Sequence, residues 1–141
     1  MTRLIVADEA DLMLLGIRTI LQEYPQFKLV DIARDADTLL KQIQATQPHL
    51  VLFNERLDPF VDVLLLVERI KTLTLTSKLI ITGNLIDGLL VRDLFASGVS
   101  AYLYTGDDLT TCLHPCIRNG ASQSSLSLTY RQCRISGHHA V

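Results

Sequence analysis

Short apolar runs alternate with amphipathic segments along most of the chain. The runs at residues 3–7, 27–32, 48–54, 78–82 and 100–104 consist of a few consecutive aliphatic or aromatic residues between polar or small ones. Short runs with polar boundaries are typical of strands buried on both faces of a parallel sheet. The run at 27–32 alternates more, so we expect one wetter face there. Between the runs, residues 11–21, 35–45, 61–73 and 85–96 carry apolar residues at helical spacing.

Strands that alternate with helices predict βαβ units and a parallel sheet covered by helices on both faces. Right-handed crossovers leave few topologies for such a chain. About five units favour an α/β flavodoxin-like fold with the strand order 2-1-3-4-5. Local residues also mark helix ends. We predict Asp11 as the N-cap of the first helix, and Gly98 as the left-handed cap after the helix that ends near Ala96.

Composition agrees with a single α/β domain. The chain has 141 residues, with 13 basic and 15 acidic side chains, so it lacks the basic excess of a nucleic-acid-binding domain. We find no signal peptide and no apolar stretch long enough to span a bilayer, and we expect a cytoplasmic protein with reduced cysteines. The domain is predicted to cover residues 1–120. Residues 121–141 are predicted to be a polar tail or linker, and we expect disorder there.

Polar residues stand where the predicted strands end, which is where ligands bind in open parallel sheets. Asp8 and Glu9 follow the first run, Asn54 ends the third and Thr82 ends the fourth. Asn54 is the unusual member of this set. Its amide has no titratable proton at neutral pH and is a poor nucleophile.

At these positions the sequence resembles the response-regulator receiver domain of two-component signalling, over residues 3–118. It is most similar to receivers that precede a helix-turn-helix output domain. The resemblance aligns Asp8 and Glu9 with the acidic pair that holds Mg²⁺ in the family. It aligns Asn54 with the phospho-accepting aspartate, and Thr82 with the hydroxyl residue that contacts the phosphoryl group.

Two further positions extend the resemblance. Tyr102 matches the aromatic residue that changes rotamer on activation. Thr105 falls where the family keeps a lysine that pairs with the phosphoryl oxygens. The loop after the third strand differs from the family's Met-Pro-Gly pattern, since it contains Leu57-Asp58-Pro59-Phe60 and is one residue longer.

The differences predict a degenerate receiver, or pseudo-receiver. The Asn54 amide cannot form the mixed anhydride that a carboxylate forms with phosphate, and Thr105 offers a neutral hydroxyl in place of a cation. Without a third carboxylate we expect no cofactor and only weak Mg²⁺ binding at most. An engineered Asp→Asn change in an active receiver is the alternative explanation of Asn54. The missing lysine argues against it, because a single engineered change would have left the lysine in place.

Each matched residue also has a simpler explanation. Asp8 and Glu9 can be solvated charges between a strand and a helix, although their place opposite Asn54 favours a site. Thr82 can be an ordinary β-favouring residue, and we weigh that explanation equally with the switch role. For Tyr102 we favour a half-buried strand aromatic over a switch.

The predicted last helix contains residues that need separate consideration. Cys112 and Cys116 would share a helix face, but His114 would point away and no fourth ligand is evident, so we expect no metal site there. Buried cysteines acting as small hydrophobic residues explain them better. Pro115 predicts a late start or a kink in this helix.

We expect no enzyme activity, because the chain has no Gly-rich phosphate loop and no nucleophile-base arrangement at the strand ends. The first hypothesis is a phosphorylation-independent, receiver-like signalling domain that dimerises or docks onto a protein partner, in transcriptional regulation as the resemblance implies. By the same resemblance, its surface would extend from Leu85 to Ala96, from Ser100 to Tyr104 and over the last helix. The first alternative is the N-terminal regulatory part of a DNA-binding response regulator. This chain has no recognition helix, so it should not bind nucleic acid directly. The second alternative is a small-molecule sensor that uses the crevice at the strand ends.

Overall fold

The computed structural model describes residues 1–84 and 88–104. In chain order the elements are β1 (Thr2–Ala7), α1 (Asp11–Leu21), β2 (Phe27–Ala33), α2 (Ala36–Thr46), β3 (Leu50–Asn54), α3 (Val63–Leu73), β4 (Lys78–Gly83), α4 (Gly88–Ala96) and β5 (Ala101–Tyr104). The strands form one sheet in the order β2-β1-β3-β4-β5, and every neighbouring pair is parallel. The predicted fold and strand order are therefore confirmed.

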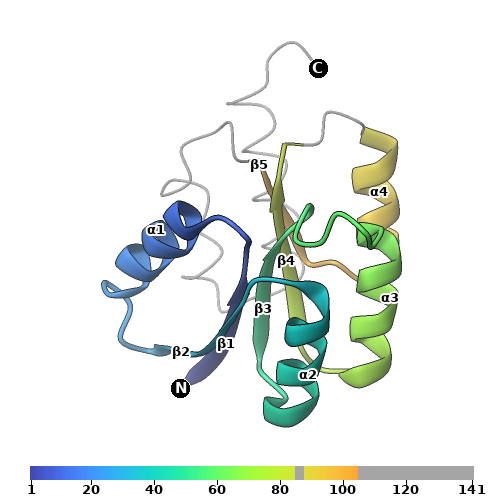
Figure 1. Ribbon diagram of the computed structural model, residues 1–141. Coiled ribbons are helices and arrows are strands. Elements are labelled where there is room, and N and C mark those ends of the chain that lie inside the picture. The colour runs from blue at the N-terminus through green and yellow to red at the C-terminus, as the bar shows by residue number, and fades with distance from the viewer. Residues whose placement is uncertain (85–87, 105–141) are drawn as a thin grey trace.

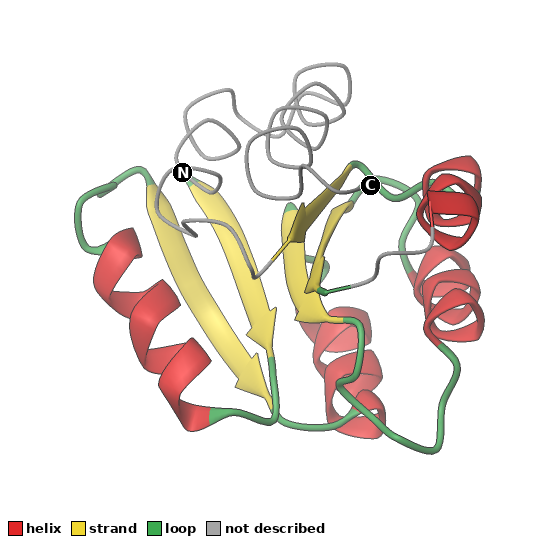
Figure 2. Cartoon of the chain, turned by 90° about the horizontal axis from the view of Figure 1, so that it is seen from above, coloured by secondary structure: helices red, strands yellow, loops and turns green. Residues whose placement is uncertain are grey.

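Alternation along the strands divides the core into two halves. Even-numbered residues of β1, β3 and β4 pack with α1, and odd-numbered residues pack with α2, α3 and α4. In β5 the parity is reversed, so that Tyr102 belongs to the half with α4. Figure 1 shows α1 on one side of the sheet and α2, α3 and α4 on the other, and Figure 2 shows helices flanking the sheet when it is viewed from above.

Side-chain caps fix the start of two helices. The Asp35 carboxylate accepts the Thr38 N–H at 2.8 Å at the start of α2, and the Asp62 carboxylate accepts the Leu64 N–H at 2.8 Å at the start of α3. At the end of α4, Gly98 has φ of 106°, which confirms the predicted left-handed cap.

The prediction of Asp11 as an N-cap is wrong. The N-cap of α1 is Ala10, which makes no side-chain cap bond, and Asp11 is the first helical residue. The main chain there is instead held by Asp8, whose carboxylate accepts the Ala10 N–H at 2.8 Å. Asp11 is free to use its side chain elsewhere, and it pairs with Arg34.

Other boundaries and faces differ in smaller ways. Helix α3 begins at Val63 and not at Val61, because the cap is Asp62. Leu40 on α2 is half-buried and packs at the margin of the core. Leu12 and Leu15 are exposed, although they share the helical spacing of α1.

Several predictions fall outside the described residues. They concern the last helix and its Pro115, the cysteine and histidine set, Thr105, and the tail at 121–141. None of the helices in the two described ranges has the length and apolar character that crossing a bilayer requires.

Candidate functional site

The candidate site lies at the carboxyl ends of β1, β3 and β4. Parallel register keeps these ends level, since Ala7 pairs with Phe53 and Asn54 pairs with Thr82. Because side chains alternate between the faces of the sheet, Asp8, Asn54 and Thr82 fall on the face that α1 covers. Three of the residues predicted from the strand ends are thus brought together.

The Asn54 side chain acts as a hydrogen-bond donor toward this site. Its Oδ1 accepts the Arg56 N–H at 2.8 Å, and its Nδ2 donates to the Thr82 Oγ1 at 3.4 Å. Since a main-chain N–H can only donate, the bond from Arg56 fixes which end of the amide is the oxygen. The amide N–H₂ group therefore faces the site, where it lowers the pKa of the Asp8 carboxylate.

Asp8 is a carboxylate withdrawn from water, with 3 % of its surface exposed. Burial raises its pKa above the ordinary value of 3.8. The hydrogen bonds from Ala10 and Asn54 oppose the rise, and the charge of Glu9 adds to it. The two hydrogen bonds compensate only part of the cost of burying the charge.

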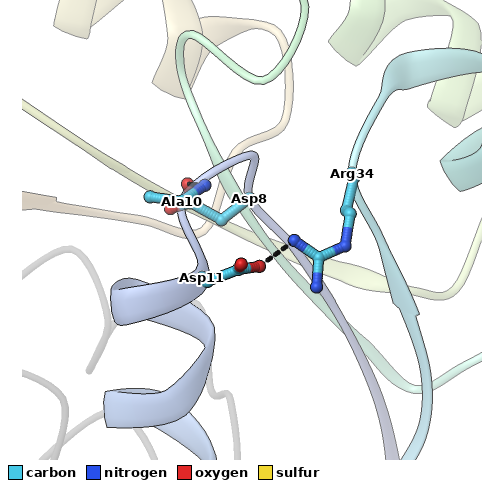
Figure 3. A network of polar contacts seen from close by, with 4 residues as sticks. All are labelled: Asp8, Ala10, Asp11 and Arg34. Atoms are coloured by element: carbon cyan, nitrogen blue, oxygen red, sulfur yellow. Dashed lines mark hydrogen bonds and ion pairs between the residues drawn. The ribbon is translucent and has the colours of Figure 1, made fainter.

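The acidic residues next to Asp8 face water. Glu9 is exposed, and Asp11 is 81 % exposed at the start of α1. Arg34, from the segment after β2, reaches toward Asp11 and pairs with it (Figure 3). A pair this exposed contributes little to stability, typically about 0.2–1 kcal/mol.

We tested whether the site fits the Mg²⁺ ion that the receiver fold implies. Magnesium needs oxygen ligands in octahedral geometry. Asn54 turns its N–H₂ group and not its oxygen toward Asp8, so it cannot serve as a ligand in this orientation. No cluster of three or more His, Cys, Asp or Glu residues suited to a metal occurs within the described ranges. The arrangement does not fit the ion, because a donor stands where a third oxygen ligand is needed.

A second polar cluster at the same edge lies on the opposite face of the sheet. Glu55, the residue after β3, is 8 % exposed. Its carboxylate accepts the Tyr102 hydroxyl at 3.1 Å and the Asn84 N–H at 3.0 Å. Tyr102 is fully buried, not half-buried as predicted.

Glu55 was not predicted as a site residue, because it begins the loop that follows the predicted third strand. Strand alternation could have found it. Asn54 pairs with Thr82, so the next residue on each strand, Glu55 and Gly83, falls on the other face, where Tyr102 also lies. The predicted roles of Asp8, Glu9, Asn54, Thr82 and Tyr102 remain predictions.

Comparison with known proteins places this fold in one class. No protein-family model matches the chain, and no curated protein sequence matches it. Solved structures do match, and they include receiver domains of response regulators and a LuxR-family response regulator. The chain therefore has the receiver fold, as its sequence predicted.

Three structures illustrate the likeness. The receiver domain of the response regulator NarL from Mycobacterium tuberculosis has a TM-score of 0.75 at 20 % identity, over 85 % of this chain and 95 % of that one. The isolated receiver domain of RcsB from Salmonella enterica serovar Typhimurium has a TM-score of 0.73 at 17 % identity, over 83 % and 88 %. A LuxR-family response regulator from Aurantimonas sp. SI85-9A1 has a TM-score of 0.76 at 16 % identity, over 95 % and 98 %. At such identities the likeness concerns the fold.

Proposed function

We propose that this chain is a receiver-like signalling domain that works without phosphorylation of Asn54. The orientation of the Asn54 amide carries the proposal. Its nitrogen donates toward Asp8 and Thr82, and its oxygen is taken by the Arg56 N–H. A phosphoryl acceptor needs a free nucleophilic oxygen at this place, and the amide offers a donor.

The same contacts suggest why an amide suits the site. Asp8 is buried beside the charge of Glu9, and a carboxylate at position 54 would add a further negative charge. The amide N–H₂ group instead favours the charged form of Asp8 and lowers its pKa. In this proposal Asn54 does part of what a cation does in an active receiver, since it stabilises the buried carboxylate without an ion.

A domain without a reactive group would act through its surface. We propose that it binds a protein partner or a second copy through the face that includes α4 and β5. Leu89 on α4 is 63 % exposed, which supports this choice of face. Sedimentation velocity on the native chain and on Leu89→Lys tests the dimer form of the proposal. If the native chain is a dimer and Leu89→Lys abolishes it, the proposal is supported. If the dimer is unaffected by the substitution, the interface lies on another face.

Intact mass spectrometry after incubation with acetyl phosphate and Mg²⁺ tests the central proposal. We expect no phosphoryl adduct on the native chain. An adduct on the native chain would mean that another residue accepts phosphate, and the proposal would be wrong. The matched variant is Asn54→Asp. An adduct on that variant alone would show that the rest of the pocket is competent, which favours the engineered or recently lost acceptor.

The other two hypotheses receive different support. The names of the structural neighbours include a LuxR-family regulator and RcsB bound to a promoter, which favours a place in transcriptional regulation. The sensor hypothesis receives no such support. A described cavity lined by Arg18, Leu29 and Asp31 lies along β2, away from the crevice at the strand ends.

A further inference from the structure

The buried carboxylate of Glu55 has a role that the strand-end site around Asn54 does not explain. With 8 % of its surface exposed, the side chain must find hydrogen bonds inside the protein. Both oxygens accept one: Oε1 from the Asn84 N–H at 3.0 Å, and Oε2 from the Tyr102 hydroxyl at 3.1 Å. Both donors are neutral groups. The ion pair found among the described residues joins Arg34 to Asp11 and does not involve Glu55.

The space for this carboxylate depends on the glycine beside it. A Cβ atom on Gly83 would lie 2.3 Å from the Glu55 Cδ and 2.6 Å from each carboxylate oxygen. Any side chain at position 83 would therefore force the carboxylate out of its place. Gly83 is needed here for room and not for an unusual backbone angle, since Gly98 has the positive φ among the described glycines.

The two ends of Glu55 join three segments of the sheet edge. Its N–H donates to the Thr82 carbonyl at 2.8 Å, which ties its main chain to β4. Its side chain then crosses over Gly83 to reach Asn84, just after β4, and Tyr102 in β5. A conformational change that moved Tyr102 outward, or that shifted the residues after β4, would break a hydrogen bond to a buried carboxylate.

We propose that Glu55 is a built-in latch that holds Tyr102 buried and locks the ends of β3, β4 and β5 in one arrangement. The latch is a hydrogen-bond acceptor of the chain itself, on the face opposite Asn54. The inference deepens the proposed function, because it names what keeps the domain in a single state when nothing is attached to Asn54. It requires that substitutions of Glu55, Gly83 and Tyr102 have non-additive effects on the free energy of unfolding.

A double-mutant cycle between Glu55 and Tyr102 tests this dependence in the full chain. We expect Tyr102→Phe to raise the unfolding equilibrium constant roughly tenfold, as the loss of a hydrogen bond to a charged group does. In the Glu55→Ala background the same change should have a much smaller effect. Urea unfolding followed by circular dichroism gives both numbers. Equal effects of Tyr102→Phe in the two backgrounds would overturn the latch.

Gly83→Ala gives an independent cycle. The new methyl group must displace the carboxylate, so we expect Gly83→Ala to cost about as much as Glu55→Ala, and to cost little once Glu55 is alanine. Gly16→Ala is the matched control, since a Cβ on Gly16 meets nothing within 4 Å. It should show no dependence on Glu55. An additive effect of Gly83→Ala would mean that the carboxylate does not lie over Gly83.

A third measurement separates a latch from simple space filling. In a chain labelled with ¹³C on its four tyrosine rings, Tyr102→Phe identifies the Tyr102 signals by NMR. Glu55→Gln keeps one oxygen that can accept the Asn84 N–H, and its N–H₂ group can donate to the Tyr102 hydroxyl oxygen. Glu55→Met keeps only the volume. The latch predicts native-like Tyr102 signals in the glutamine variant, and shifted or exchange-broadened signals in the methionine variant. Native-like signals in both variants would mean that Glu55 only fills space, and the latch would be wrong. None of these results depends on the mass measurement, so the latch and the proposed function can fail separately.

Discussion

Two buried carboxylates lie at the same edge of the sheet, on opposite faces, and they are stabilised differently. Asp8, on the α1 face, has the charge of Glu9 beside it, and burial raises its pKa. Glu55, on the α4 face, accepts hydrogen bonds from a tyrosine hydroxyl and a main-chain N–H. Asp8 also accepts a hydrogen bond, from the Ala10 N–H, so the two carboxylates differ in that Asp8 has the negative charge of Glu9 beside it.

The contrast arises from a single step along β3. Asn54 and Glu55 are consecutive, so their side chains point to opposite faces. The Asn54 side chain, a neutral amide, points into the crevice on the α1 face. The Glu55 carboxylate points to the face that α2, α3 and α4 cover. This edge of the sheet keeps an anion after Asn54, but directs it into the protein and not toward a ligand.

Asn54→Asp should break the contrast most strongly. It places a second carboxylate near Asp8 and removes the amide donor that now lowers the pKa of Asp8. In the absence of Mg²⁺ we expect the free energy of unfolding to fall by about 1–3 kcal/mol, since a buried charge loses its partner and gains a like charge. Urea unfolding in EDTA measures the loss.

Asn54→Ala is the control for that variant, because it removes the amide without adding a charge. It should be less destabilised than Asn54→Asp in EDTA. Added Mg²⁺ should recover stability in Asn54→Asp alone. If Asn54→Asp proved as stable as the native chain without metal, the donor role of Asn54 would be wrong.

Asp8→Asn should have a smaller effect, with a characteristic pH dependence. The folded-state pKa of Asp8 is raised by burial above the ordinary value of 3.8. The folded chain thus holds this proton at a pH where the unfolded chain has released it, and Asp8 lowers stability as pH rises through that window. We expect Asp8→Asn to gain stability relative to the native chain as pH increases from below 3.8 to neutral.

Asp35 supplies a control of the opposite sign. Its pKa is lowered by the hydrogen bond from the Thr38 N–H, so its contribution is present above the ordinary value of 3.8 and disappears as pH falls below it. Asp35→Ala should therefore cost about 1 kcal/mol at neutral pH, as the loss of an N-cap does. Its cost should become smaller in acid, because the neutral carboxyl group is a weaker acceptor. Parallel pH profiles for the Asp8 and Asp35 variants would contradict the assignment of Asp8.

The fold was predictable because buried parallel strands leave a clear pattern. Runs such as 48–54 and 78–82 are apolar on both faces and end in polar residues, and their ends meet at one edge. The sequence alone therefore predicts that Asp8, Asn54 and Thr82 lie together. Their placement depends only on where each strand ends, and the hydrophobic pattern predicts those ends well.

Glu55 and the start of α1 were not predictable in the same way. A glutamate after a strand usually faces water, and its burial here depends on the missing side chain of Gly83, far away in sequence. At α1, the Asp11 side chain has two possible uses, a cap or a partner for Arg34, and the fold selects the second. Both cases turn on contacts between distant segments, which local propensity does not contain.

Thr82→Val should sharpen the comparison through a smaller effect. Thr82 is 1 % exposed, and its Oγ1 accepts from the Asn54 Nδ2 at 3.4 Å, a long neutral hydrogen bond. Its removal should cost about 0.5–1 kcal/mol. Thr82→Ser, which keeps the hydroxyl, should retain this bond. Urea unfolding of both variants, alone and with Asn54→Ala, tests whether the cost of Thr82→Val depends on the amide.

The ion pair of Arg34 with Asp11 should contribute least. Both side chains are largely exposed, at 58 % and 81 %, so water screens their attraction. A double-mutant cycle with Arg34→Ala and Asp11→Ala should give a coupling of about 0.2–1 kcal/mol at low salt and less in concentrated salt. A coupling that stayed large at high salt would mean that Arg34 acts as a fixed cation for the acidic residues around Asp8. Asp8 and Glu55 would then be stabilised more alike than we propose. The positive charge of Arg34 would stabilise the acidic residues on the α1 face, as the hydrogen-bond donors stabilise Glu55 on the other face.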